Sequence, residues 1–368
     1  MQTITYMYTE LIKIIEGGLR SDTKKVIAYS KHLAKKLREE GSYKLADKIE
    51  KTINGFTGIP VFKDQLFDAP VDNETRLNIA DVILPKDLKL DISISKNIEG
   101  PINNFISLVN SKNKIRSKGI EINLSLLLYG PPGCGKTTLA KHIAKELEIP
   151  IVIARFDSLI SSFLGNTAKN IRKLFDYARN KPCILFLDEF DAIAKARNDN
   201  HETGELKRVI NSLLQNIDNF LETGILIAAT NHEQLLDNAI WRRFEKIIKV
   251  NKPDLNEIKV LMRYYFNKVN AQVDTEGKKF ETLLSYFTDL SHSEIIKIVN
   301  SAFYNTIIQS KEFDYDEIFS EFFRYKNNNR YTLEELICFL SRSHISQIQI
   351  SNYLDISIRQ VRNALDVE

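Results

Sequence analysis

The chain is poor in cysteine and has neither a long apolar run nor a strong net charge. Its three cysteines in 368 residues lie far apart, which argues against a disulfide framework and against a zinc site. No apolar run approaches the roughly 18 residues that a membrane span requires. The first residues also do not form a basic segment followed by an apolar one. We therefore expect a soluble, cytoplasmic protein with no membrane partner.

Charge and repeats do not point to a particular partner either. The 51 basic and 48 acidic residues leave a formal charge of +3, which is too small to predict a polyanionic partner. We see no internal repeat of the kind that builds solenoids. The length and the apolar fraction of 43% are typical of two or three globular domains. Any binding of nucleic acid must come from a local site.

The most informative stretch is the glycine-rich run GPPGCGKT at Gly130–Thr137. A strand-like segment, 124–129, precedes it and a helical pattern, 137–148, follows it, which is the context that a phosphate-binding loop requires. Glycines let backbone N–H groups turn inward around phosphates, and the helix N-terminus adds its positive end. The alternative is a plain turn between strand and helix, which the complete motif disfavours.

Residue types within this loop predict individual roles. Lys136 is expected to reach the β- and γ-phosphates, Thr137 to hold Mg²⁺, and Thr138 to help seat the α-phosphate. The residues expected to bind the nucleotide in this loop are Pro132, Gly133, Cys134, Gly135, Lys136, Thr137 and Thr138.

A second motif places two carboxylates after a buried strand. The apolar segment 183–187 ends in Asp188 and Glu189, and the carboxyl end of a strand faces the ligand crevice of an α/β sheet. Asp188 is expected to bind Mg²⁺ through water, and Glu189 to act as general base on the attacking water. An acidic helix N-cap is the alternative, and the preceding phosphate loop makes it the weaker one.

Strand-like and helical segments alternate through the middle of the chain, which predicts an α/β fold. We expect a parallel five-stranded sheet with helices on both faces. The five expected strands are 124–129, 151–155, 184–187, 224–229 and 247–250.

The flanking regions read as helical, apart from a segment rich in Gly, Pro and Asp. The expected division is an N-terminal helical bundle (1–54), a linker and lead-in (55–97), the nucleotide-binding core (98–252), a helical lid (253–326) and a C-terminal unit (327–368). The N-terminal bundle has surplus basic charge, which fits a solvated surface better than its alternative, a partner-binding module.

Together these motifs resemble the AAA family of ATPases in its narrow sense, over roughly residues 98–308. The segment 224–231 is similar to the family's sensor strand, whose asparagine helps to place the lytic water. The resemblance assigns that role to Asn231. It also implies ATP and Mg²⁺ as cofactors and ATP hydrolysis as the activity.

The segment 235–244 resembles the family's second region of homology. The resemblance implies that Arg242 and Arg243 are arginine fingers that reach the nucleotide of a neighbouring subunit. Such fingers imply a homo-oligomeric ring, with a hexamer as the expected form. A surface salt-bridge pair is the alternative for these two arginines.

Two further positions follow from the same resemblance. The segment 159–166 falls where the family carries its pore loop, which implies that Phe163 grips a translocating polypeptide. A phenylalanine tucked into the core is the alternative there. Residues 291–295 occupy the place of the family's turn against adenine, and His292 stands where glycine is usual. His292 is therefore expected to contact the nucleotide.

The core also resembles a group of small prokaryotic AAA ATPases that carry a helical N-terminal segment of this size. Such proteins are often encoded beside a subtilisin-like peptidase. The resemblance therefore implies a protein-directed role, with a subtilisin-like peptidase as a candidate partner.

The C-terminal segment 347–361 is similar to a helix-turn-helix, with Asp355 at the usual turn glycine. Residues that would lie on its recognition helix are Ser357, Ile358, Arg359, Gln360 and Arg362. Residues 340–368 carry three arginines and three acids, and a neutral segment is a poor DNA reader. Packing against protein is therefore favoured over DNA binding.

The expected function is ATP hydrolysis that drives remodelling or translocation of a protein substrate by an oligomeric ring. The alternative is a nucleotide-switched DNA-binding or transcription-related protein that uses the C-terminal helix-turn-helix. A third reading is an assembly adaptor whose ATPase activity only sets the oligomeric state.

Overall fold

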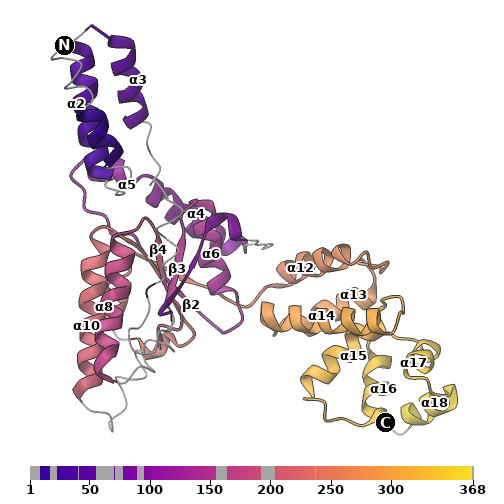
Figure 1. The fold of residues 1–368 in the computed structure, drawn as a ribbon. Coiled ribbons are helices and arrows are strands. Elements are labelled where there is room, and N and C mark those ends of the chain that lie inside the picture. The colour runs from indigo at the N-terminus through magenta and orange to yellow at the C-terminus, as the bar shows by residue number, and fades with distance from the viewer. Residues whose placement is uncertain are drawn as a thin grey trace.

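The computed structural model describes residues 9–16, 23–39, 41–54, 70, 78–88, 95–154, 164–191, 204–236 and 238–366. Figure 1 shows three parts along the chain: an N-terminal helical hairpin, a central α/β core, and a helical C-terminal part reached through one extended segment. Phe163 lies outside the described residues, so its predicted role in a pore loop stays a prediction.

The core is built on a six-stranded sheet in the order β1-β3-β4-β5-β2-β6. The strands are β1 (Ala80–Ile83), β2 (Ser125–Tyr129), β3 (Ile151–Ala154), β4 (Ile184–Leu187), β5 (Ile225–Thr230) and β6 (Lys246–Lys249). Strands β2 to β6 pair in parallel, as the alternation of apolar segments predicts. The residues of β4 and β5 are all buried, which is typical of parallel strands covered on both faces.

The predicted five-stranded sheet is wrong in one respect, because a sixth strand joins it. Strand β1 pairs antiparallel with β3, from Ala80 opposite Ala154 to Ile83 opposite Ile151. It lies in the segment expected to be linker and lead-in. A four-residue edge strand with neighbours on one side only needs no long apolar pattern, so its sequence signal is weak.

Helices cover both faces of the sheet. The core helices are α4 (Lys96–Asn110), α5 (Lys112–Arg116), α6 (Lys136–Glu146), α8 (Leu164–Arg179), α10 (Gly204–Leu221) and α11 (Asn238–Trp241). On one face α8 and α10 lie side by side, with the rings of Phe175 and Phe220 edge to face at 5.8 Å between centroids. On the other face α4 and α6 bury Phe105 and Ile143 against the sheet. The core therefore has the three-layer arrangement expected of an α/β fold.

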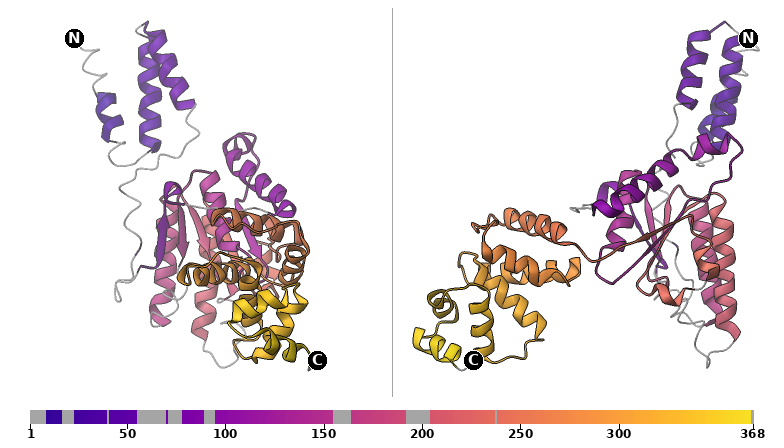
Figure 2. Two further views of the ribbon diagram at one scale, coloured as in Figure 1. Left: turned by 90° about the vertical axis from the view of Figure 1, so that its right-hand side faces the viewer. Right: turned by 180° about the vertical axis from the view of Figure 1, so that it is seen from behind.

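The C-terminal part is entirely helical within the described residues. Its helices are α12 (Leu255–Lys268), α13 (Lys278–Phe287), α14 (His292–Ile308), α15 (Tyr315–Lys326), α16 (Leu333–Arg342), α17 (Gln347–Leu354) and α18 (Ile358–Asp366). One hydrophobic cluster runs from Ile258 on α12 to Ala364 on α18. Tyr286 stacks on Phe322 at 5.2 Å between ring centroids, and Phe339 of α16 packs against both. Helices α16–α18 thus pack onto the lid, as Figure 2 also shows.

The turn between α17 and α18 begins with a residue in the left-handed conformation, and the predicted helix-turn-helix stays a prediction. Asp355 adopts φ +54° and ψ +46°, the left-handed conformation that glycine usually supplies and that Asp tolerates better than most residues. Ser346 caps α17 through a capping box with Gln349.

The N-terminal hairpin is small. Helices α2 (Thr23–Glu39) and α3 (Tyr43–Asn54) pack around Leu33, Ala34, Leu37 and Ala46. Arg38 forms ion pairs with Asp47 and Glu50 that lie on the surface, and such exposed pairs add little stability. Among all helices that the structure describes, none is both long and apolar enough to cross a membrane.

Candidate nucleotide-binding site

The loop after β2 has the backbone of a phosphate cradle. Gly133 and Gly135 have φ values of +74° and +93°, and Gly135 is the residue from which α6 begins. A Cβ on Gly130 would lie 2.1 Å from the carbonyl oxygen of Val250, so only glycine fits there. The first turn of α6 carries no acidic side chain, which leaves its N-terminus suited to an anion. The loop therefore fits the phosphates that its sequence predicts.

Lys136 is folded back onto this loop. Its Nζ donates to the carbonyl oxygens of Gly130 and Pro131, both at 2.8 Å, and the residue is only 6% exposed. Burial lowers the pKa of Lys136, against the attraction of nearby groups that include Asp188. A buried ammonium with three donors and neutral carbonyl partners is well placed to exchange them for charged phosphate oxygens.

The structure brings the two predicted Mg²⁺ ligands together. The hydroxyl of Thr137 donates to Oδ2 of Asp188 at 2.6 Å. The described residues contain no group of three His, Cys, Asp or Glu side chains able to hold a metal alone. The adjacent hydroxyl and carboxylate of Thr137 and Asp188 fit Mg²⁺, which keeps several waters and is usually held by one or two protein oxygens together with substrate phosphates.

Glu189 follows at the end of β4 in an unusual backbone conformation. Its φ is +50°, which is rare for a residue with a side chain, and its backbone N–H donates to Oδ1 of Asp188 at 3.0 Å. Glu189 is exposed, whereas Phe190 beside it is fully buried. Such backbone strain is often found at functional sites.

Asp191 ties the end of β4 to the end of β5, a role that its local sequence does not predict. It is 4% exposed, and its Oδ1 accepts hydrogen bonds from Oγ1 of Thr230 at 3.2 Å and from the backbone N–H of Asn231 at 3.4 Å. Asp191 therefore holds Asn231 in place beside the residues that follow β4. The signal in the sequence was a third acidic residue close to Asp188 and Glu189.

The two predicted arginine fingers differ in their surroundings. Arg243 donates from Nε and Nη2 to the carboxylate of Asp218 at 2.6 and 2.9 Å, and from Nη1 to the carbonyl of Ala239 at 2.6 Å. The bond to Asp218 raises the pKa of Arg243 further. Arg242 is exposed, and its side chain makes no hydrogen bond or ion pair to any part of the chain that the structure describes.

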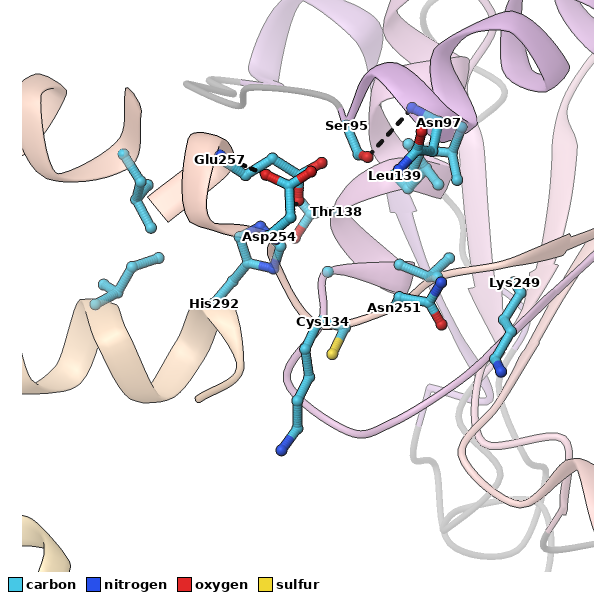
Figure 3. Close-up of a pocket in the computed structure, with 16 residues that line it drawn as sticks. Ser95, Asn97, Cys134, Thr138, Leu139, Lys249, Asn251, Asp254, Glu257 and His292 are labelled. Carbon is cyan, nitrogen blue, oxygen red and sulfur yellow. Dashed lines mark hydrogen bonds between the residues drawn. The ribbon is translucent and has the colours of Figure 1, made fainter. Parts of the chain in front are cut away.

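A cavity of about 320 Å³ lies between the phosphate loop and the lid. Figure 3 shows its walls: Cys134, Thr138 and Leu139 on the core side, and Glu257 and His292 on the lid side. The lid contacts the loop directly, because the backbone N–H of Ser293 donates to the carbonyl of Gly133 at 3.0 Å. The cavity thus adjoins the phosphate loop on the side that faces α12 and α14.

His292 lines this cavity at the first residue of α14. Its Nδ1 is buried and has no hydrogen-bond partner among the described residues. Burial lowers the pKa of His292, with Glu257 acting in the opposite direction. The ring is therefore neutral at pH 7, with one donor and one acceptor nitrogen.

A hydrogen-bonded cap fixes the start of α14 against the loop. The backbone N–H and the hydroxyl of Ser291 both donate to Oε2 of Glu294 at 2.7 Å, and the hydroxyl of Tyr325 donates to Oε1 at 2.7 Å. These bonds, led by the one from the Ser291 backbone, lower the pKa of Glu294 to about 2. Tyr325 thereby links α15 to the turn that contacts Gly133.

Sequence comparison identifies the domain that contains this site. Residues 126–252 match the family described as "ATPase family associated with various cellular activities (AAA)". These residues are therefore similar to an AAA ATPase domain. The resemblance of the core to this family is confirmed over that range, and the implied peptidase neighbour stays a prediction.

Three relatives show how far the similarity extends. An uncharacterized AAA family ATPase, y4kL, of Sinorhizobium fredii is 43% identical over 199 residues, which cover 54% of this chain and 59% of that protein. Proteasome-activating nucleotidase 1 of Haloferax volcanii is 39% identical over 165 residues, 43% of this chain and 41% of its own length. The ATP-dependent zinc metalloprotease FtsH of Parabacteroides distasonis is 33% identical over 250 residues, 65% of this chain and 34% of its own. The match thus spans 34–59% of these relatives.

Replacing Asp191 is expected to impair ATP hydrolysis more than nucleotide binding. Asp191→Val removes the acceptor that fixes Thr230 and Asn231, and a displaced catalytic group can cost up to about 100-fold in rate. Asp191→Asn keeps an oxygen in that place and should retain most of the activity. Steady-state kcat and the Kd for ADP test this, and a Val variant with unchanged kcat would contradict the role.

Loss of the Tyr325 hydroxyl should make the lid less stable in a pH-dependent way. Because the folded pKa of Glu294, about 2, is below its ordinary value of 4.5, Glu294 adds stability above about pH 4.5 that is lost as pH falls toward 2. Tyr325→Phe should lower Tm at pH 7, and the difference from wild type should shrink through that acid range.

Tyr304→Phe provides the control for this experiment, because Tyr304 on α14 is 62% exposed. It should leave Tm unchanged at every pH. A difference between Tyr325→Phe and wild type that stays constant as pH falls from 4.5 toward 2 would show that the Tyr325 bond does not act through the charge of Glu294.

Proposed function

We propose that this protein is a Mg²⁺-dependent ATPase that acts as an oligomeric ring and uses ATP hydrolysis to remodel protein substrates. One observation carries the catalytic part. The loop after β2, the two acids after β4 and Asn231 after β5 all lie at the carboxyl ends of adjacent parallel strands. The lid cavity adjoins them through the contact between Ser293 and Gly133. The AAA domain assigned to residues 126–252 supports the same activity.

The residues at this edge divide the work of hydrolysis. Lys136 would leave its two carbonyl partners for the phosphate oxygens, and Thr137 and Asp188 would hold Mg²⁺. The ion, when bound, neutralises charge on the phosphates. Glu189 accepts the proton of the attacking water, and Asn231, held through Asp191, orients that water. Catalysis then rests on positioning and electrostatics.

The exposed position of Arg242 supports its action on a neighbouring subunit. An arginine whose side chain has no partner among the described residues can supply positive charge elsewhere, and this is the role of an arginine finger. Arg243, bound to Asp218 and Ala239, instead positions the segment that carries Arg242. We therefore assign the finger to Arg242 and a positioning role to Arg243, within a homo-oligomeric ring that we expect to be a hexamer.

The names of two relatives support the proposal that the substrates are proteins. One is an ATP-dependent zinc metalloprotease and another a proteasome-activating nucleotidase, so both names couple ATP or a nucleotide to proteolysis. Each aligns with this chain over less than half of its own length. Phe163 is proposed as the residue that grips the polypeptide, and a subtilisin-like peptidase as a candidate partner.

DNA binding is the second candidate, favoured by the left-handed turn at Asp355 and by the exposed side chains of α18. Two of those side chains are already engaged, however. Gln360 Oε1 accepts from the backbone and hydroxyl of Ser357, and Arg362 donates to Gln347 at 3.4 Å. We therefore rank DNA below a protein substrate.

One titration separates these functions. The ATPase rate per subunit is measured against protein concentration, alone and with an unfolded polypeptide or duplex DNA. A rate that rises with concentration and is stimulated by polypeptide supports the proposed ring. Stimulation by DNA alone would favour the second candidate, and a rate independent of concentration would contradict catalysis between subunits.

The two arginines should give different defects when each is replaced by alanine. Arg242→Ala should lower kcat by about 10³ or more with no loss of stability, because an arginine finger acts on the transition state. Arg243→Ala should lower Tm as well, because it leaves Asp218 without its bidentate partner. Thermal unfolding and steady-state kinetics test this pair. Equal loss of stability in both variants would contradict the separation of roles.

A further inference from the structure

The cavity beside the phosphate loop has the character of a pocket for a flat, largely apolar group. Leu139 and Val250 of the core and Leu261 and Ile296 of the lid supply apolar surface. The phosphate loop contributes Cys134 and Gly135 at one end, so a nucleotide with its phosphates on α6 would extend its base into this space. Binding pockets of this kind use a few polar groups to fix the orientation of the ligand.

One polar atom in this pocket has no hydrogen-bond partner among the residues that the structure describes. Among the described residues, four buried side-chain oxygen or nitrogen atoms lack a hydrogen bond, and His292 Nδ1 is the one that belongs to a residue lining the cavity. Buried polar groups in folded proteins are nearly always satisfied, so an exception calls for an explanation. A ligand that enters the cavity would supply the missing partner.

The acidic groups beside His292 are the carboxylates of Asp254 and Glu257, and each accepts a hydrogen bond from the backbone of the other residue. Asp254 accepts from the backbone N–H of Glu257 at 2.9 Å, and Glu257 accepts from that of Asp254 at 3.1 Å. Figure 3 shows the His292 ring on the side of the cavity where these two carboxylates lie. Lys252, which also lines the cavity, donates to the carbonyl of Asp289 at 2.6 Å. The edge of a bound nucleobase near His292 would therefore face the negative charge of Asp254 and Glu257.

This charge distinguishes between purines. Adenine presents an amine at its 6-position, which is a hydrogen-bond donor, whereas guanine and hypoxanthine present a carbonyl oxygen there. A donor is attracted by the two carboxylates and can donate to an acceptor nitrogen of the neutral imidazole, whereas a carbonyl oxygen is repelled by the carboxylates. The surroundings of His292 thus match a 6-aminopurine.

We propose that His292 reads the nucleobase and gives this chain its preference for adenine over 6-oxopurine nucleotides. The imidazole supplies a contact that depends on the hydrogen-bonding groups of the base. This inference rests on the proposed function, because it requires the cavity to hold the base of the nucleotide.

The test is a set of binding measurements by calorimetry with ADP, IDP and purine riboside diphosphate, none of which is an ATPase substrate. The wild-type chain should bind ADP at least about 3- to 10-fold more tightly than the other two, the size expected for one net hydrogen bond. His292→Leu should bring the three Kd values within about twofold of each other. His292→Asn, whose amide lies near the position of Nδ1, should retain most of the preference.

His142→Leu is the matched control, because His142 lies on α6 and does not line the cavity. It should leave the ratio of the Kd values unchanged. If His292→Leu fails to fold, as Tm would show, His292→Ala takes its place, and its Kd values should likewise fall within about twofold of each other.

Two outcomes overturn the inference, and a third concerns the function beneath it. Equal Kd values for ADP and IDP in the wild type would remove the preference, and an unchanged ratio in His292→Leu would assign it to another residue. Failure of a folded wild-type chain to bind any of the three nucleotides would overturn the proposed ATPase function itself, together with the inference that rests on it.

Discussion

The site depends on the parallel pairing of β5 between β4 and β2. In this register Leu187 lies opposite Ala228 and Tyr129 lies opposite Thr230. The residues that follow each strand therefore leave the sheet at one edge: the phosphate loop after Tyr129, Asp188 and Glu189 after Leu187, and Asn231 after Thr230. Because parallel strands share the direction of their carboxyl ends, no single segment has to carry the whole site.

Two further contacts join the strand ends at this edge to each other and to the lid. Asp191 fixes the ends of β4 and β5 to each other, and the backbone of Ser293 joins the lid to Gly133. Glycine suits position 133 because its φ is +74°, which other residues rarely adopt, and because a Cβ there would lie 2.1 Å from the Ser293 hydroxyl oxygen. The lid and helices α16–α18 share one hydrophobic cluster, so the nucleotide cavity borders a body that extends to the C-terminal helix.

The sequence predicted the parts of the site that follow from local patterns. Local motifs predicted the loop at Gly130–Thr137 and the acids after β4, and the order of the strands brings these distant segments together. The alternation of apolar, strand-like segments with helical segments predicted the five parallel strands. Strand β1 was not predicted, because four residues at the edge of a sheet show little apolar periodicity. No local pattern predicts side-chain contacts between distant segments. Such contacts determine the role of Asp191, the different surroundings of Arg242 and Arg243, and the lack of a described partner for His292 Nδ1. The ion pair between Arg243 and Asp218 on α10 is one such contact.

The central claim is that one chain holds an incomplete catalytic site, which Arg242 of a neighbour completes. Mixing Glu189→Gln with Arg242→Ala tests this directly, after size-exclusion chromatography has shown that each variant assembles. Each variant alone should be nearly inactive, because one lacks the base and the other lacks the finger. In the mixture, an Arg242→Ala subunit with intact Glu189 can receive Arg242 from a Glu189→Gln neighbour, so ATPase activity should reappear well above the sum of the two. A mixture that assembles yet shows only that sum would contradict completion of the site between subunits.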